Sequence, residues 1–164
     1  DFDENHILNK EGLFRVRIDK PIEQYLICKG DVLFLSRGHR NWAAPMVDEL
    51  QDTVAAGHFF VITVRNETIM PEYLAWYINQ TPAQEYLHNI ARRGTHMPLV
   101  TLSAFKGLTI EVPDIAIQHR IVELSRLMER ENKLLDELQE KRLLLINTIS
   151  LKATQKAIKT GKEK

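Results

Sequence analysis

Apolar residues recur at alternating steps of three and four along the C-terminal part of the chain. From residue 117 to about residue 159 there is no proline, and the residues are charged, polar or aliphatic. This spacing predicts one long amphipathic α-helix. At ~1.5 Å per residue the helix would extend roughly 60 Å, which is longer than a domain of this size is wide. Its apolar face therefore requires a partner.

The positions reached by these steps form a seam that is apolar except at Glu131 and Arg142. The seam consists of Ile121, Leu124, Met128, Glu131, Leu135, Leu138, Arg142, Leu145 and Ile149. In an antiparallel coiled coil, a-type positions meet d-type positions of the partner. If Glu131 faces Arg142 of the partner, the other opposed pairs are Leu135–Leu138, Met128–Leu145 and Leu124–Ile149.

This register predicts a two-fold antiparallel helix pair. The partner is either a second copy of the chain or a second, similar helix in a longer protein. A parallel dimer would place Glu131 against Glu131, and like charges in contact are unfavourable. A helix packed back on its own domain is the remaining alternative.

The N-terminal part alternates short strand and helix signals. Strands are predicted at residues 13–18 (LFRVRI), 32–35 (VLFL), 53–56, 59–64 (FFVITV) and 108–112. The alternation of apolar and basic residues makes the first a half-exposed strand, and the β-branched and aromatic content of 59–64 favours a central position.

Proline and glycine mark the helices of this part. One helix is predicted at 71–80, where Pro71 takes a first helical position, and another from Pro82 to near Gly94. The fold class is therefore α+β. We expect an N-terminally shortened domain at 1–113, a long spacer or dimerisation helix at 114–160 and a tail at 161–164. The missing initial methionine suggests a fragment.

Composition narrows the class of protein. The chain has 164 residues, of which 44% are hydrophobic and 27% charged, and its formal net charge is zero. These values exclude a disordered chain, and the neutral total argues mildly against a nucleic-acid binder. No signal peptide or membrane span is present, and the single cysteine, Cys28, excludes an internal disulfide. Together these features favour the cytoplasm. Cys28 adjoins an apolar strand, so we expect it to be buried.

The sequence offers no catalytic constellation. It lacks a glycine-rich phosphate loop, HExxH, CxxC and GxSxG. Its six histidines are scattered without a second ligand-type residue at helical spacing, so no metal site and no cofactor are expected. An enzyme with an unrecognised site remains the least favoured class.

Two acid-free basic segments are candidate nucleic-acid contacts despite the neutral total. The first segment is 36–42, and its loop, residues 37–42 (the first loop), offers Arg37, His39, Arg40, Asn41 and Trp42. The second segment is 88–96, which begins with His88, and its loop, residues 92–96 (the second loop), offers Arg92, Arg93, Thr95 and His96. Arginine contacts phosphate or guanine, asparagine contacts adenine, and an exposed tryptophan can stack on a base. The alternative is a solvated loop with the tryptophan folded onto the domain, and two arginines that complement a helix dipole.

The order of several short motifs resembles one half of the specificity subunit of Type I restriction–modification systems. The motifs are Gly30-Asp31-Val32-Leu33 before a strand, Pro71-Glu72-Tyr73-Leu74 at a helix start, Val112-Pro113 ending a strand, and Gln118 with Ile121 at the start of the long helix. The resemblance covers about residues 25–150. The chain departs from the family in reading PDIAIQH where a double proline and a glutamate usually precede the glutamine.

The resemblance implies a non-catalytic DNA-recognition subunit of a DNA adenine methyltransferase/endonuclease complex. Such a domain reads one half-site of a bipartite target in double-stranded DNA, while spacer helices set the distance between half-sites and dock the methyltransferase subunit. Whether a restriction subunit also takes part is left open. The runner-up is a non-enzymatic protein-interaction module that dimerises through its long helix.

Overall fold

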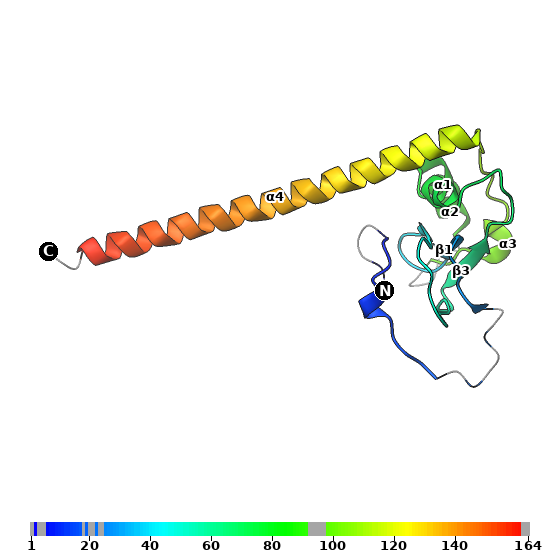
Figure 1. Cartoon of the computed structure of the whole chain (residues 1–164), viewed down its shortest axis with the longest axis horizontal. Coiled ribbons are helices and arrows are strands. Elements are labelled where there is room, and N and C mark those ends of the chain that lie inside the picture. Colours follow the sequence, from blue (N-terminus) through cyan, green and yellow to red (C-terminus); the bar gives the residue numbers. More distant parts are fainter. Residues whose placement is uncertain are drawn as a thin grey trace. The chain divides into compact units, whose positions relative to one another are not determined.

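A computed structural model describes residues 2, 6–17, 19, 22, 25–91 and 98–161, with side chains to residue 154 in the last helix (Figure 1). The chain divides into two compact units, Asp1–Glu123 and Leu124–Lys164. The first contains a small sheet and short helices. The second contains most of the long helix.

The sheet of the first unit has three antiparallel strands in the order β2-β1-β3: β1 is Asp31–Leu35, β2 is Ala43–Pro45 and β3 is Phe59–Thr63. The predicted strands at 32–35 and 59–64 are confirmed. The predicted central position of 59–64 is wrong, because β1 lies between the other two. β1 is buried on both faces, which is why its apolar run does not alternate.

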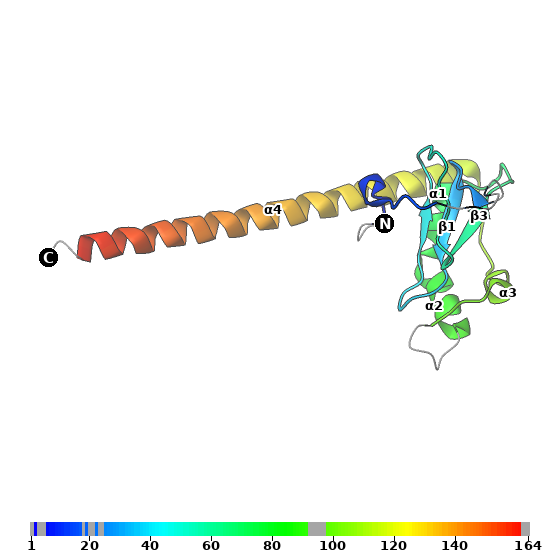
Figure 2. The same ribbon diagram turned by 90° about the horizontal axis from the view of Figure 1, so that it is seen from below.

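Helices cover one face of this sheet. They are α1 (Pro71–Ile78), α2 (Thr81–Ile90) and α3 (Leu102–Phe105). The chain also forms a short 3-10 helix, η1 (Lys10–Gly12), near its start and the long helix α4 (Ile115–Gly161). Val32 and Phe34 of β1 form one core cluster with Ile78 and Leu87. Tyr86 of α2 donates to the carbonyl of Ala104 at 2.9 Å, and Figure 2 shows α2 and α3 at the same end of the unit.

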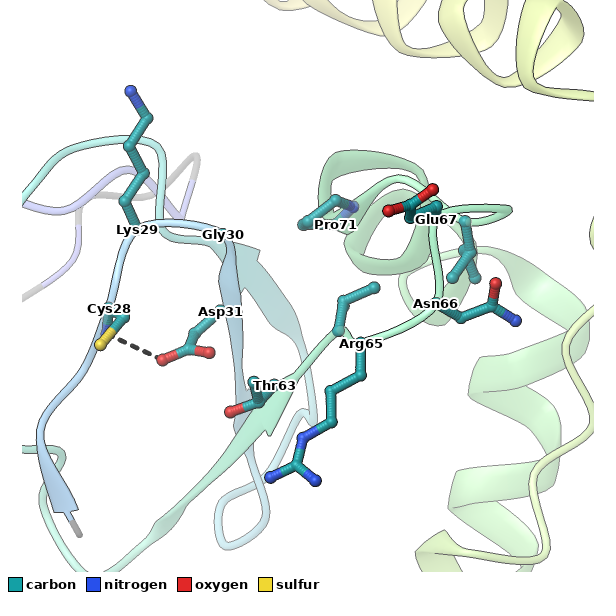
Figure 3. Close-up of a pocket in the computed structure, with 11 residues that line it drawn as sticks. Cys28, Lys29, Gly30, Asp31, Thr63, Arg65, Asn66, Glu67 and Pro71 are labelled. Atoms are coloured by element: carbon teal, nitrogen blue, oxygen red, sulfur yellow. Dashed lines mark hydrogen bonds between the residues drawn. The ribbon is translucent and has the colours of Figure 1, made fainter.

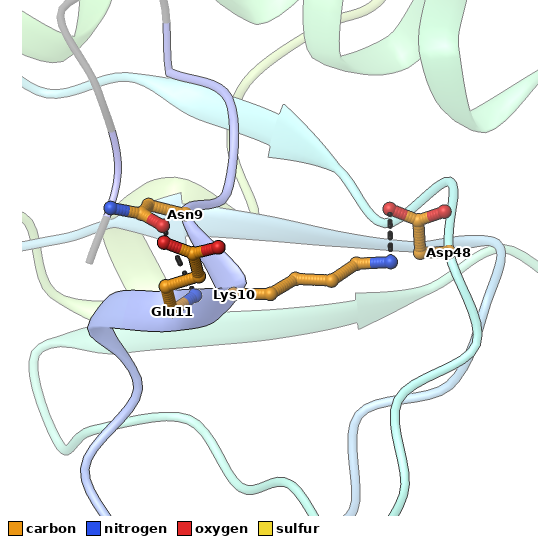
Figure 4. A network of polar contacts seen from close by, with 4 residues as sticks. All are labelled: Asn9, Lys10, Glu11 and Asp48. Carbon is orange, nitrogen blue, oxygen red and sulfur yellow. Dashed lines mark hydrogen bonds and ion pairs between the residues drawn. The ribbon is translucent and has the colours of Figure 1, made fainter.

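A smaller core cluster fills the other face of the sheet. Leu33 packs there with Ile27 and Met46, and the N-terminal segment adds Phe2 and Leu8. The same segment is tied to the loop after β2 by an ion pair of 3.0 Å between Lys10 and Asp48 (Figure 4). Both side chains are about half exposed, so this pair contributes little to stability.

Three of the predicted strands are wrong. Residues 13–17 are exposed and lie in no strand, and residue 18 lies outside the described residues. Residues 53–56 contribute one isolated bridge, from Val54 to Leu26. Residues 108–112 form no strand, because their contacts are made to helices and side chains instead of to a neighbouring strand: Leu108 and Ile110 pack on the first core cluster, and Tyr73 donates to the carbonyl of Glu111 at 2.6 Å.

α4 confirms the predicted long helix. It has 47 residues, which corresponds to a length of about 70 Å. Its apolar seam residues from Leu124 to Ile149 are 44–60% exposed. None of the helices in the described part of the chain is long and apolar enough to cross a membrane. The antiparallel pairing itself stays a prediction, since it concerns a second helix.

The side chain of Gln118 joins the start of α4 to the rest of the first unit. It is fully buried. Its Nε2 donates to the carbonyls of Thr68 at 2.8 Å and Pro113 at 2.7 Å, and its Oε1 accepts from the backbone N–H of Met70 at 2.9 Å. Met70 is the N-cap of α1, whose cap has no side-chain hydrogen bond of its own. One amide therefore holds three backbone segments together.

Replacing Gln118 with alanine should strongly destabilise the domain. The substitution removes three hydrogen bonds, of roughly 1 kcal/mol each, and we expect a loss of about 3 kcal/mol in the free energy of unfolding. Urea unfolding of the full chain measures this loss. His119→Ala, an exposed neighbour on the same helical turn, is the control and should change stability by less than about 0.5 kcal/mol. Equal stability of the two variants would contradict the role given to Gln118.

Candidate nucleic-acid interface

The first loop begins where β1 ends, and its base is fixed by buried backbone bonds. Ser36 is buried, and both its N–H and its hydroxyl donate to the carbonyl of His58, at 2.9 and 2.7 Å. The carbonyl of Ser36 accepts from the N–H of Val100 at 2.9 Å. The loop therefore starts from a point held on both sides.

The next residues join the first loop to the chain that follows the second loop. The N–H of Gly38 donates to the carbonyl of Pro98 at 3.2 Å, and Arg37 forms an isolated bridge with Leu99. The predicted contacts Arg92, Arg93, Thr95 and His96 lie outside the described residues. Residues 91 and 98 on either side of them are described, and Pro98 lies beside the first loop.

A polar groove of about 720 Å³ lies between the first loop and α2. One wall is formed by Gly38, His39, Arg40 and Asn41 of the first loop. The other is the polar face of α2, formed by Thr81, Gln84, Glu85, His88 and Asn89. Ala91 and Pro98 also line it. The groove is thus lined by the first loop and by Ala91 and Pro98, the described residues nearest to the second loop on either side in the sequence.

Of the groove residues of α2, only His88 was noted from the sequence, as part of a basic segment, and the others were missed. Their signal is the helical spacing of Thr81, Glu85 and His88, which are exposed, against Ala83 and Leu87, which are buried in the core. An exposed polar face on a surface helix is usually a solvated face. The sequence alone therefore gives no reason to separate this face from any other.

The predicted contact residues of the first loop differ in their exposure and in their hydrogen bonds to the rest of the domain. Arg37, His39 and Arg40 are exposed. Asn41 is half-buried, and its side-chain nitrogen donates to the carbonyl of Leu35 at 2.8 Å, which spans the loop. The three exposed basic side chains are available to a ligand, whereas one end of the Asn41 amide already has a structural partner.

The prediction that Trp42 is exposed is wrong. Trp42 is half-buried, with its ring centroid 4.9 Å from that of Phe2 and 5.6 Å from that of Phe59. His6 stacks on it at 4.5 Å. Packing against these aromatic neighbours buries apolar ring surface that would otherwise face water. The alternative of a tryptophan folded onto the domain describes this residue.

Asn79 at the end of α1 fixes the edge of the sheet below the groove. Its Oδ1 accepts from the N–H of Ala43 and its Nδ2 donates to the carbonyl of Ala43, both at 2.8 Å. Ala43 belongs to the edge strand β2, so the amide takes the place of a neighbouring strand. This arrangement holds α1, and with it the start of α2, against the strand that follows the first loop.

The turn before β1 carries the glycine and aspartate of the motif in a structural role. Gly30 has φ of +91°, a conformation that glycine adopts without strain. Asp31 is buried, and its Oδ2 accepts from the N–H of Cys28 at 2.8 Å (Figure 3). This turn lines a second hollow of about 320 Å³ that includes Lys29 and Arg65.

Cys28 is exposed, so the prediction of a buried thiol is wrong. The apolar side chains of this region that enter the core are those of its neighbours Ile27 and Leu33. Among the described residues, no group of three or more His, Cys, Asp or Glu side chains is placed to hold a metal ion.

Comparison with known families decides the class of protein. A family model described as the Type I restriction modification DNA specificity domain matches residues 16–141, which is more than half of the chain. The chain belongs to this family. No curated protein matches it. The specificity domain is a DNA-recognition module, and it has no catalytic role in Type I systems.

The motifs that carry the resemblance are structural residues of the specificity domain. Gly30 and Asp31 close the turn before β1, and Gln118 joins α4 to the loop before α1. Tyr73 of the second motif is buried, and burial, with Tyr77 and Glu111 nearby, raises the pKa of its hydroxyl above the usual value. The phenol therefore stays protonated and donates to Glu111.

Replacing Asn79 with aspartate should destabilise the domain at neutral pH. A carboxylate still accepts from Ala43 N–H, but it repels the Ala43 carbonyl to which the amide donates. We expect a loss of about 2 kcal/mol. The exposed Asn89→Asp is the matched control, with a change within about 0.5 kcal/mol. Denaturant unfolding measures both variants.

The pH dependence of the Asn79→Asp variant is a second readout. Folding disfavours the charged carboxylate at this position, so its folded-state pKa should be raised. The stability of the variant should then be highest below the unfolded pKa and fall as pH rises through the folded one. A variant that is stable at neutral pH would show that the bond to the Ala43 carbonyl contributes little.

Proposed function

We propose that the chain is a DNA sequence-recognition subunit of a Type I restriction–modification enzyme, or one half of such a subunit. In this proposal residues 1–113 read one half-site of a bipartite target in double-stranded DNA. Residues 114–160 form the spacer helix, which pairs with a second such helix and docks the methyltransferase subunit. The observation that carries the proposal is the groove that joins the first loop to the flanks of the second.

The proposed DNA contacts are the exposed basic side chains of the first loop and the residues Arg92, Arg93, Thr95 and His96 of the second loop. Arg37, His39 and Arg40 are exposed at or beside the groove. Arg92, Arg93, Thr95 and His96 are proposed on their chemistry. Local basic groups on a neutral protein suffice for binding, because phosphate contacts act over the interface and not over the whole surface.

Two features of α4 support pairing and docking. Its seam places apolar residues opposite apolar residues when Glu131 faces Arg142. A second set of apolar side chains lies off the seam, and one partner helix covers only the seam. The off-seam set consists of Leu127, Leu134, Leu143, Leu144, Ile146 and Leu151, which are 56–67% exposed. Around residues 143–151 the helix is apolar on several sides, which indicates more than one partner. We assign the second partner to the methyltransferase subunit.

Duplex binding by the full chain should weaken steeply with salt. Phosphate contacts release counterions, so the logarithm of the affinity should fall linearly with the logarithm of the salt concentration. Arg37→Ala with Arg40→Ala should reduce the slope by about 2, and Arg92→Ala with Arg93→Ala by a similar amount. Fluorescence anisotropy with a labelled duplex measures the slopes.

Arg126→Ala with Arg130→Ala, on α4 and part of neither loop, removes the same charge and is the matched control. It should leave the slope unchanged. Binding that ignores salt, or an equal effect of the control pair, would count against DNA recognition through these loops.

A charge swap tests the proposed antiparallel pairing with a second copy. Glu131→Arg and Arg142→Glu should each weaken the dimer, because each places like charges opposite one another at two symmetric positions. The double variant restores opposite charges and should restore the dimer. Sedimentation equilibrium of the full chain measures the dissociation constant, and we expect a roughly tenfold loss and recovery for about 1.4 kcal/mol.

The charge swap distinguishes an antiparallel dimer from a parallel dimer and from a monomer. A parallel dimer opposes identical positions, so the double variant would not recover relative to the single ones. A chain that is monomeric at all concentrations would exclude self-pairing and would favour a second half of a longer subunit as the partner.

A further inference from the structure

The polar face of α2 carries hydrogen-bonding groups that the fold does not use. Glu85, His88 and Asn89 are exposed and line the groove. Within the described part of the chain, none of the three has a hydrogen-bond or ion-pair partner. Gln84 beside them differs, since its side-chain nitrogen donates to the carbonyl of Ile78 at 2.7 Å. The three free groups follow one another at helical spacing.

The opposite face of α2 is firmly held. Leu87 and Ala83 are buried, and Tyr86 bonds to the carbonyl of Ala104. Gly107 packs so closely on the Tyr86 hydroxyl that a Cβ at this position would collide with it. The free groups are therefore presented on a rigid element, and a rigid element loses little conformational entropy when it binds a ligand.

The charges of the groove residues indicate which of them can contact base edges and which can contact phosphates. Among the described residues that line the groove, Glu85 is the one acid, and Arg40, His39 and His88 line the same groove. A carboxylate repels phosphate, but it accepts a hydrogen bond from the exocyclic amine of cytosine. Asparagine makes a bidentate contact with adenine. The α2 face thus suits base edges, whereas the exposed arginines of the first loop suit the backbone.

The dimensions of α2 agree with this assignment. It has 10 residues, or about 15 Å of length, and the major groove is about 12 Å wide and admits an α-helix. The first loop adjoins the helix across the groove, where the DNA backbone would border an inserted helix.

We propose that α2 is the base-reading helix of this domain, with Glu85 and Asn89 as specificity-determining residues in the major groove. Glu85 selects a cytosine and Asn89 selects an adenine within the same half-site, while Arg40 positions the backbone. This assignment rests on the proposed DNA-recognition function and deepens it. The proposal names the residues that decide the target, which the family motifs do not.

Selection from a duplex pool with a randomised central segment tests the proposal. The full chain and its Glu85→Gln and Asn89→Ala variants are each used to enrich bound duplexes, which are then sequenced. Glu67→Gln, which removes an equal charge from an exposed site outside the groove, is the matched control. Binding of each variant is also measured against the duplex that the unaltered chain selects.

The expected result is a change of preference at single positions. Glu85→Gln should lose a cytosine preference and Asn89→Ala an adenine preference, each by roughly 5- to 150-fold, with the other positions and the salt slope unchanged. Glu67→Gln should keep every preference. Thermal unfolding should show all variants folded, since the three sites are exposed.

Two results would overturn the proposal. The variants could keep the preferences of the unaltered chain, or Glu85→Gln could tighten binding to all duplexes by the same factor as Glu67→Gln, which would show a general repulsion of phosphate. Either result leaves DNA recognition standing while removing α2 from base reading. Failure of the unaltered chain to bind any duplex in a salt-dependent manner would instead overturn the proposed function itself.

Discussion

The structure depends on the buried amide of Gln118. Three hydrogen bonds tie the first turns of α4 to Thr68 and Met70 before α1 and to Pro113 before α4. Without this amide, three backbone groups would lose a hydrogen-bond partner, at a cost of several kcal/mol. The bonds hold the first turns of α4 within the first unit. In the proposed function, this is the part of α4 from which the spacer extends.

Side-chain amides replace secondary structure at two places in this small domain. Gln118 bonds the loop before α1, and Asn79 bonds both backbone groups of Ala43 on the edge of β2. A three-stranded sheet with one five-residue central strand has few ladder bonds to stabilise it. Hydrogen-bonded amides add such bonds and also specify one arrangement of the elements. Gln118 belongs to the family motifs, and its hydrogen bonds identify the fold and not a DNA sequence.

Elements with strong local signals could be predicted from the sequence. β1, β3, α1, α2 and α4 follow from apolar runs, a first-turn proline and the long heptad pattern. The strands expected at 13–18, 53–56 and 108–112 failed, because a strand needs a neighbour and alternation does not say whether one exists. Tyr73 instead takes the carbonyl of Glu111. The first loop was predicted by its charge, whereas the face of α2 was not, because Glu85 and Asn89 resemble any solvated helix surface until the groove is seen.

Footprinting of the full chain on a duplex that it selects tests the central claim most directly. The account joins two parts, a domain that reads a half-site and a helix that pairs antiparallel with a two-fold axis. It predicts two protected patches with inverted sequences, separated by unprotected base pairs. Protection of both patches should be lost together when the helix pair is broken. A single continuous patch, bound by a chain that is dimeric in solution, would contradict the account.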